Sequence, residues 1–112
     1  MYNFEKLNVW KKAMDLAEFL YELQCQFPKE EKHELGSQLR RAATSIPLNI
    51  AEGSSSHSRK VFRQYLLTAR GSLYEIVTIL KLARRFYNIK TDKGLSSCSE
   101  VGRLLSGLVN SL

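Results

Sequence analysis

A repeat in the second half of the chain most constrains its fold. Apolar or small residues recur at alternating intervals of four and three between residues 62 and 87. This spacing gathers them into a heptad seam on one side of a helix. A helix from about Ser58 to Asn88 would be roughly 45 Å long at 1.5 Å per residue. The seam consists of Phe62, Leu66, Ala69, Leu73, Ile76, Leu80, Ala83 and Tyr87.

Three shorter segments carry apolar stripes of the same helical period. The first stripe lies between Asn8, a plausible N-cap, and Pro28, which ends a helix. The second runs from about Glu34 to a C-cap at Gly53, and the last starts near Ser96. Four amphipathic helices with short connections predict an all-α fold, an antiparallel up-down-up-down four-helix bundle. At 112 residues we expect a single domain.

The segments outside the helices have their own signals. Residues 1–8 alternate apolar and polar side chains, which predicts an extended N-terminal arm whose apolar side packs on the bundle. The turn formers Asn88, Asp92 and Gly94 predict a loop over residues 88–95.

Pro47 falls inside the second helical stripe. It lacks an N–H, and its ring collides with the carbonyl of Ala43, so the helix must either end at Ile46 or continue with a kink. The apolar spacing continues beyond the proline, which favours a kinked second helix. The hydroxyls of Thr44 and Ser45 can then bond to the freed carbonyls.

A second row lies beside the seam on the long helix. Such a helix has more apolar surface to bury than one bundle core requires, which favours a subunit interface. The alternative is a wide core face. The row contains Tyr65, Ser72, Ile79, Leu82 and Phe86, with Glu75 among them.

Charge is distributed unevenly along the chain. The net charge is +6, but residues 35–90 hold ten Lys and Arg against only Glu52 and Glu75. A basic middle segment favours an anionic partner, most simply nucleic acid, whereas the plainer interpretation is a solvated helix face. No helix-turn-helix, RRM, KH or zinc-finger pattern is present, so binding would be directed at phosphate backbones. The candidate nucleic-acid-binding residues are Arg40, Arg41, Arg59, Lys60, Arg63, Arg70, Lys81, Arg84 and Arg85.

Residues for catalysis or metal binding are sparse. His33 and His57 fall in polar connections, and Cys25 and Cys98 belong to no metal-spaced or redox motif. We therefore expect no catalytic residue, no metal and no cofactor. With no signal peptide and no apolar run of membrane-spanning length, we expect a cytoplasmic protein without a membrane partner.

Two acids stand out against the basic middle segment. Glu52 and Glu75 are either a catalytic acid pair or, as we favour, partners of arginines across helices or subunits. We assign structural or interface roles to a set that surrounds them. These residues are Pro47, Asn49, Glu52, Tyr65, Ser72 and Glu75.

Several motifs carry a family resemblance over nearly the whole chain. They are F-x-x-L-x-V-W-x-x-A in residues 4–13, Phe27-Pro28, QLRRAA in 38–43, S-I-P-x-N-I-A-E-G in 45–53 and G-S-L-x-E in 71–75. This set resembles the four-helix bundle family of 23S rRNA intervening-sequence proteins, which includes or is close to accessory proteins of diversity-generating retroelements. The resemblance implies a ring-like homopentamer and, for the retroelement branch, a basic surface that engages nucleic acid and a reverse transcriptase. It implies no enzymatic activity.

The sequence thus favours a non-catalytic, oligomeric nucleic-acid-binding or scaffold protein, whose target would be structured RNA or DNA. The alternative is a protein-interaction adaptor that docks an acidic partner such as a reverse transcriptase. An enzyme that uses Glu52, Glu75 or a histidine is the weakest hypothesis, because no convergent set of catalytic groups is visible.

Overall fold

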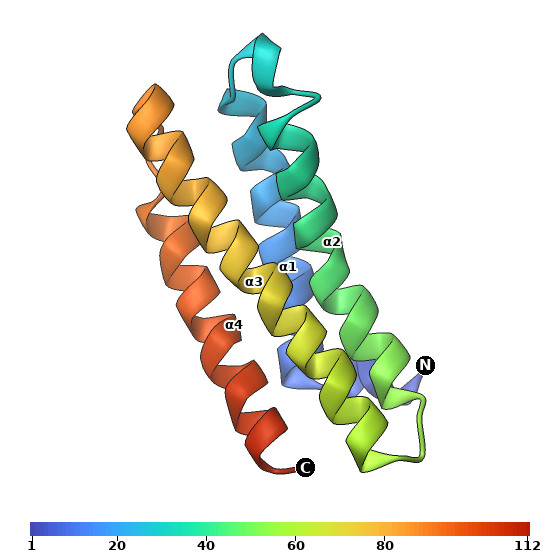
Figure 1. Cartoon of the computed structure of the whole chain (residues 1–112). Coiled ribbons are helices and arrows are strands. Elements are labelled where there is room, and N and C mark those ends of the chain that lie inside the picture. Colours follow the sequence, from blue (N-terminus) through green and yellow to red (C-terminus); the bar gives the residue numbers. More distant parts are fainter.

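The computed structural model describes all 112 residues and contains α-helices, short 3₁₀ turns and no strand (Figure 1). The predicted all-α fold is confirmed. The α-helices are α1 (Asn8–Leu23), α2 (Leu35–Ser54), α3 (Arg59–Tyr87) and α4 (Asp92–Asn110). The 3₁₀ turns are η1 (Asn3–Lys6), η2 (Gln24–Gln26) and η3 (Lys29–Glu31).

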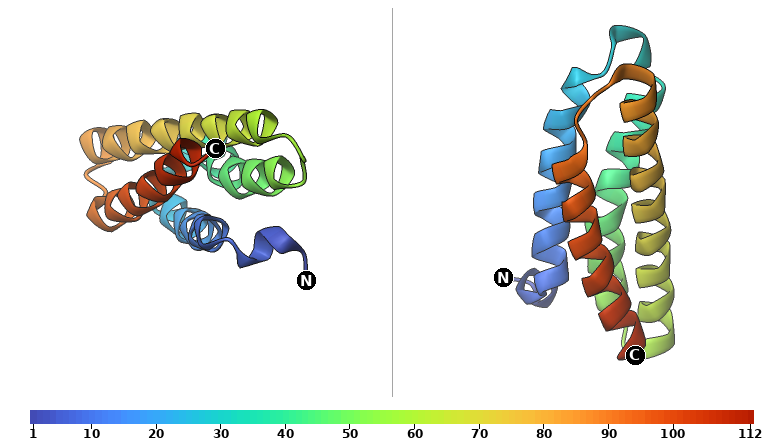
Figure 2. Two further views of the ribbon diagram at one scale, coloured as in Figure 1. Left: turned by 90° about the horizontal axis from the view of Figure 1, so that it is seen from below. Right: turned by 90° about the vertical axis from the view of Figure 1, so that its left-hand side faces the viewer.

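The four helices form an elongated up-down-up-down bundle of 44 × 21 × 21 Å. α1 and α3 each pack against both α2 and α4, and the backbones of the diagonal pairs lie farther apart. The views in Figures 1 and 2 agree with this arrangement and place both chain termini at the same end of the bundle. No helix combines the length and the apolar character that crossing a lipid bilayer requires.

The heptad seam of α3 supplies much of the core. Its six central residues, from Leu66 to Ala83, are buried, whereas Phe62 is half-buried and Tyr87 is 37% exposed. Ile79 of the second row is also buried, so part of that row belongs to the core. Both ends of α3 match the sequence prediction. The Ser58 hydroxyl accepts a hydrogen bond from the Val61 N–H at 3.2 Å, and Asn88 ends the helix with a left-handed φ of 55°.

Pro47 lies inside α2, which continues from Leu35 to Ser54 without a break. The prediction that the helix passes through the proline is confirmed. The prediction that the Thr44 hydroxyl bonds to the freed Ala43 carbonyl is wrong. Thr44 donates to the carbonyls of Arg40 and Arg41, both at 3.2 Å. Helical side chains lean toward the N-terminus, so the hydroxyl of Thr44 reaches back by three or four residues and misses Ala43.

Gly53 is not the C-cap of α2. It is buried inside the helix, and no glycine of the chain has a positive φ. A Cβ at this position would lie 2.6 Å from Cβ of Tyr65. The glycine is therefore required for the close approach of α2 and α3, not for a left-handed turn.

α4 begins at Asp92, four residues before the predicted Ser96. Of the three turn formers, only Asn88 makes a turn through its left-handed backbone. Gly94 is a buried helical residue whose missing side chain makes room for Leu80 and Phe19, at 3.2 and 3.3 Å from an ideal Cβ. Close helix packing explains this glycine, so the predicted 88–95 loop is too long.

The N-terminal arm is a 3₁₀ turn over Asn3–Lys6 and not an extended strand. Its apolar side packs as expected: the Phe4 ring meets Trp10 edge-on, with a centroid distance of 5.3 Å. The expected N-cap at Asn8 is wrong by one position, since α1 begins at Asn8 and Leu7 precedes it without a side-chain cap.

Candidate nucleic-acid interface

The basic residues of α3 form a row along one side of a single uninterrupted helix. At 100° per residue, five of them fall within about 60° of one another around the helix axis. All lie off the buried seam; Arg70 is half-buried and the others are exposed. We call this set the α3 basic row: Arg59, Arg63, Arg70, Lys81 and Arg84. Lys60 and Arg85 are also exposed, and both flank the row on the same side.

The two arginines of α2 do not extend this row. Arg40 is half-buried and donates to Gln24 Oε1 at 2.7 Å and to the Lys32 carbonyl at 3.1 Å. It thereby ties α2 to the preceding connection, which occupies its guanidinium. Arg41 is exposed and has no ion-pair partner within the chain. Of the pair, only Arg41 keeps the free guanidinium that phosphate contact requires.

A polar cluster joins α2 to α3 at mid-height. The hydroxyls of Ser45 and Ser72 lie 2.8 Å apart, and Asn49 donates to the Ser45 carbonyl at 2.7 Å and to its Oγ at 3.0 Å. The predicted structural residues Asn49 and Ser72 are thus brought together by Ser45, whose predicted role was a contact with a freed backbone carbonyl. The spacing of Ser45 and Asn49, one helical turn apart, was the available signal.

Glu52 and Glu75 are both exposed within the subunit. The two ion pairs of the chain are Lys12–Glu100 at 3.2 Å and Arg84–Asp92 at 3.3 Å, so neither acid pairs with an arginine of another helix. The predicted pairing between helices of one subunit is wrong, because both carboxylates point to solvent. Pairing between subunits stays a prediction.

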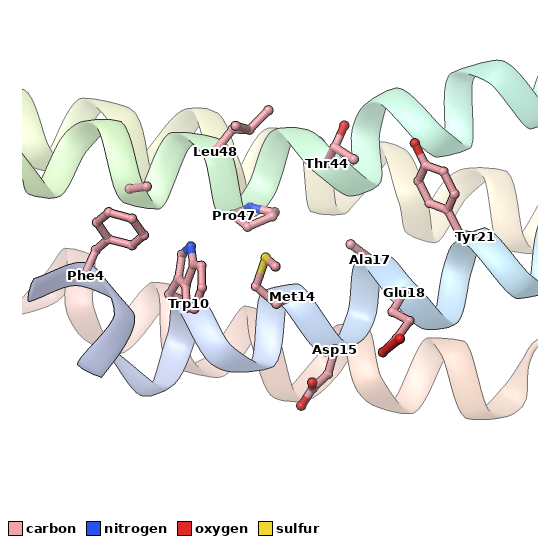
Figure 3. Close-up of a pocket in the computed structure, with 11 residues that line it drawn as sticks. Phe4, Trp10, Met14, Asp15, Ala17, Glu18, Tyr21, Thr44, Pro47 and Leu48 are labelled. Atoms are coloured by element: carbon pink, nitrogen blue, oxygen red, sulfur yellow. The ribbon is translucent and has the colours of Figure 1, made fainter. Parts of the chain in front are cut away.

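An apolar groove between α1 and α2 was not predicted. It has a volume of about 760 Å³ and includes Asp15 and Glu18 on its α1 side. Figure 3 shows Trp10 and Met14 projecting from α1 toward Pro47 of α2. The available signal was a second stripe on α1, since Trp10, Met14, Ala17 and Tyr21 follow intervals of four, three and four.

The groove leaves large apolar side chains in contact with solvent. Met14 is 45% exposed, Tyr21 44% and Leu48 57%. Pro47 of α2, by contrast, is buried, although it lines the groove. An exposed apolar surface of this kind is typical of a protein–protein contact.

The remaining titratable side chains do not cluster into a site. His33 and His57 are exposed, and no three residues of the His, Cys, Asp and Glu types lie close enough to hold a metal ion. Burial raises the pKa of Cys98 to about 11, so its thiol stays protonated at neutral pH. The Tyr87 hydroxyl donates to the Glu31 carboxylate, and this hydrogen bond raises the pKa of Tyr87.

Comparison with known proteins gives matches of two kinds, a family model and solved structures. The family model of the 23S rRNA-intervening sequence protein matches residues 5–107. A crystal structure from Bacteroides thetaiotaomicron, described as a protein with unknown function from the S23 ribosomal protein family, superposes with a TM-score of 0.80. It shares 26% sequence identity, and the match covers 91% of this chain and 95% of that one. The search of curated proteins gives no significant match. The family match spans all four helices, and the chain therefore belongs to the 23S rRNA-intervening sequence protein family.

Proposed function

We propose that this protein is a non-catalytic, oligomeric nucleic-acid-binding or scaffold protein that contacts phosphate backbones through α3. The observation that carries the proposal is the α3 basic row. Its cations share one side of a helix, and Arg84 is the single member that pairs with an acid of the chain. Arginine forks suit phosphate oxygens, and each neutralised phosphate releases condensed counterions.

The dimensions of the row suit a helical nucleic acid. From Arg59 to Arg84 the row extends over about 37 Å at 1.5 Å per residue, close to one turn of a duplex at about 34 Å. The sequence contains no helix-turn-helix, RRM, KH or zinc-finger pattern that would read bases, so recognition would follow the shape and charge of structured RNA or DNA.

Binding to structured RNA and to duplex DNA across a salt series tests this proposal. We expect the affinity to fall steeply with salt, and Arg63→Glu to weaken binding to all sequences alike. Lys11→Glu is the matched control, because Lys11 is an exposed cation on α1, away from the row. Absence of binding at low salt, or equal losses for the two variants, would refute a role for the row.

Oligomerisation is the second part of the proposal. The α1–α2 groove exposes Met14, Tyr21 and Leu48, a surface that a neighbouring subunit can bury. The family resemblance favours a homopentamer. Sedimentation analysis at micromolar concentration gives the subunit number directly. A monomer under these conditions would refute the assembly and would make the groove an open surface of the isolated bundle.

The alternative function is an adaptor that docks an acidic protein such as a reverse transcriptase. The exposed groove favours a protein partner, because apolar grooves are typical of protein contacts and contribute nothing to phosphate binding, and the α3 basic row would attract the acidic surface of that partner. Recovery of one protein in a pull-down that nuclease treatment leaves unchanged would favour the adaptor. Loss of the partner on nuclease treatment would favour the nucleic-acid function instead.

A further inference from the structure

A hollow lies where α3 ends and α4 begins. Its volume is about 690 Å³, and three of the residues that line it are the cations Lys81, Arg84 and Arg85. Asp92 is its single acid, and this carboxylate lies 3.3 Å from Nη1 of Arg84. Three cations against one carboxylate leave a net charge of +2. The hollow therefore favours an anion and most favours one with two negative charges.

Thr91 supplies an independent observation in the same place. It lines the hollow, is only 1% exposed, and its hydroxyl is the one buried side-chain polar atom of the chain without a hydrogen-bond partner. Buried hydroxyls in folded proteins are nearly always paired, and an orphan calls for an explanation. An oxygen ligand that enters the hollow would give this hydroxyl an acceptor.

The start of α4 lies at the hollow, which Thr91 and Asp92 line. Thr91 occupies the N-cap position of a 19-residue helix, yet its side chain makes no capping hydrogen bond. The first N–H groups of α4 thus have no side-chain acceptor, and they lie at the positive end of the helix dipole. Anions bind at helix starts of this kind because the N–H groups and the dipole act together.

We propose that this hollow is a discrete binding site for a phosphate group. Lys81 and Arg85 supply the cationic contacts, Thr91 supplies a buried hydroxyl, and Asp92 holds Arg84 at the rim. The intended occupant, a phosphate of a bound nucleic acid, rests on the proposed function. The site chemistry itself is independent of it and applies equally to free phosphate.

Titration of the full-length protein with inorganic phosphate, followed by amide chemical shifts, tests the site. We expect saturable shifts in Thr91 to Leu95 that sodium chloride at equal ionic strength does not reproduce. Lys81→Gln and Arg85→Gln should each weaken phosphate binding about tenfold, the effect of one lost charge-assisted hydrogen bond. Lys11→Gln should leave it unchanged, because Lys11 is an exposed cation near the start of α1, outside both the hollow and the α3 basic row.

Thr91→Val separates ligand binding from folding. The variant keeps the shape of the side chain and removes the unpaired hydroxyl, so we expect weaker phosphate binding with an equal or higher unfolding midpoint. A lower midpoint together with unchanged phosphate affinity would overturn the role of Thr91. Absence of phosphate-specific shifts, or shifts that survive both charge-removing variants, would overturn the site.

Oligonucleotides with and without a 5′-phosphate distinguish the sources of the phosphate. Stronger competition by the phosphorylated form would assign a terminal phosphate to the hollow, and equal competition would assign an internal one. Inorganic phosphate that binds while nucleic acid fails at low salt would support the site and refute the proposed function. Nucleic-acid binding without any effect of inorganic phosphate on the hollow would support the proposed function and refute the phosphate site.

Discussion

Gly53 of α2 and Tyr65 of α3 approach so closely that a Cβ on Gly53 would lie 2.6 Å from Cβ of Tyr65. The contact lies near the α2–α3 connection, where neither helix can move without disturbing the other. The absence of a side chain at Gly53 therefore allows α2 and α3 to pack this closely.

Gly53→Ala should destabilise the fold by about 1–3 kcal/mol, the range for overpacking a tight contact. The loss should exceed the gain in helix propensity of about 1 kcal/mol that alanine brings. Chemical denaturation measures the difference. Gly71→Ala is the control, because a Cβ there meets nothing within 4 Å, and we expect it to stabilise by about 0.5–1 kcal/mol. Similar effects at the two glycines would show that α2 and α3 can separate at no cost.

The Ser45–Ser72 hydrogen bond should be measurable as a coupling energy. Each change to alanine leaves the other hydroxyl without its partner across the helix interface and should cost about 1 kcal/mol. In a double-mutant cycle we expect a coupling of about 0.5–1.5 kcal/mol. Ser99→Ala, at an exposed position of α4, should be neutral. Strict additivity of the two serine changes would mean that their contact contributes nothing to stability.

Pro47→Ala should keep the helix content of the chain, because α2 already continues through this position. Alanine restores an N–H for the Ala43 carbonyl and removes the ring from the base of the groove. If the groove is a subunit interface, sedimentation should report a changed subunit number or a weaker assembly, with an unchanged circular dichroism spectrum. An unaltered assembly would place the interface elsewhere.

Cys98 predicts a loss of stability at alkaline pH. Its pKa rises from 9.0 to about 11 on folding, so the folded state holds the proton more tightly. The contribution of the Cys98 thiol to stability is complete below pH 9, where the thiol is protonated in both the folded and the unfolded state. This contribution declines as the unfolded thiol ionises between pH 9 and 11. A shift of this size is equivalent to roughly 2–3 kcal/mol.

The comparison with Cys98→Ala isolates this titration from those of lysines and tyrosines. The variant should show a shallower decline between pH 9 and 11, although its cavity lowers stability at every pH. Thiol labelling of the native protein at neutral pH provides a second measurement. Cys25 is exposed and should react, whereas Cys98 is 2% exposed and should be protected. Equal labelling rates would show that α4 opens readily.

Helix positions were predictable because burial imposes a period on the sequence. The 4,3 repeat of α3 gave both ends of that helix to within a residue, and the stripe across Pro47 indicated correctly that α2 continues. Two of the errors came from glycine. The sequence predicts a helix C-cap at Gly53 and a turn at Gly94, yet both glycines serve close helix packing, which depends on a neighbouring helix that the local sequence does not specify.

The candidate site was predictable only in part, and for a similar reason. Helical spacing placed the α3 basic row on one side of its helix. It could not show that Gln24 and the Lys32 carbonyl occupy Arg40, since these contacts depend on how the α1–α2 connection folds back. Helical spacing also placed Glu75 in an apolar row, although Glu75 is exposed and lies beyond the edge of the packed face.

The contact between α1 and α4 has a consequence for the speed of folding. Every other helix pair in contact joins neighbours in sequence, so most contacts form locally and close only short loops. Bundles of this kind fold in microseconds to milliseconds. Docking of α4 onto α1, with the Lys12–Glu100 pair at its surface, is the one pairing of α-helices that are not consecutive in the chain. We expect variants in the α1–α4 contact mainly to speed unfolding, if this docking follows the rate-limiting step.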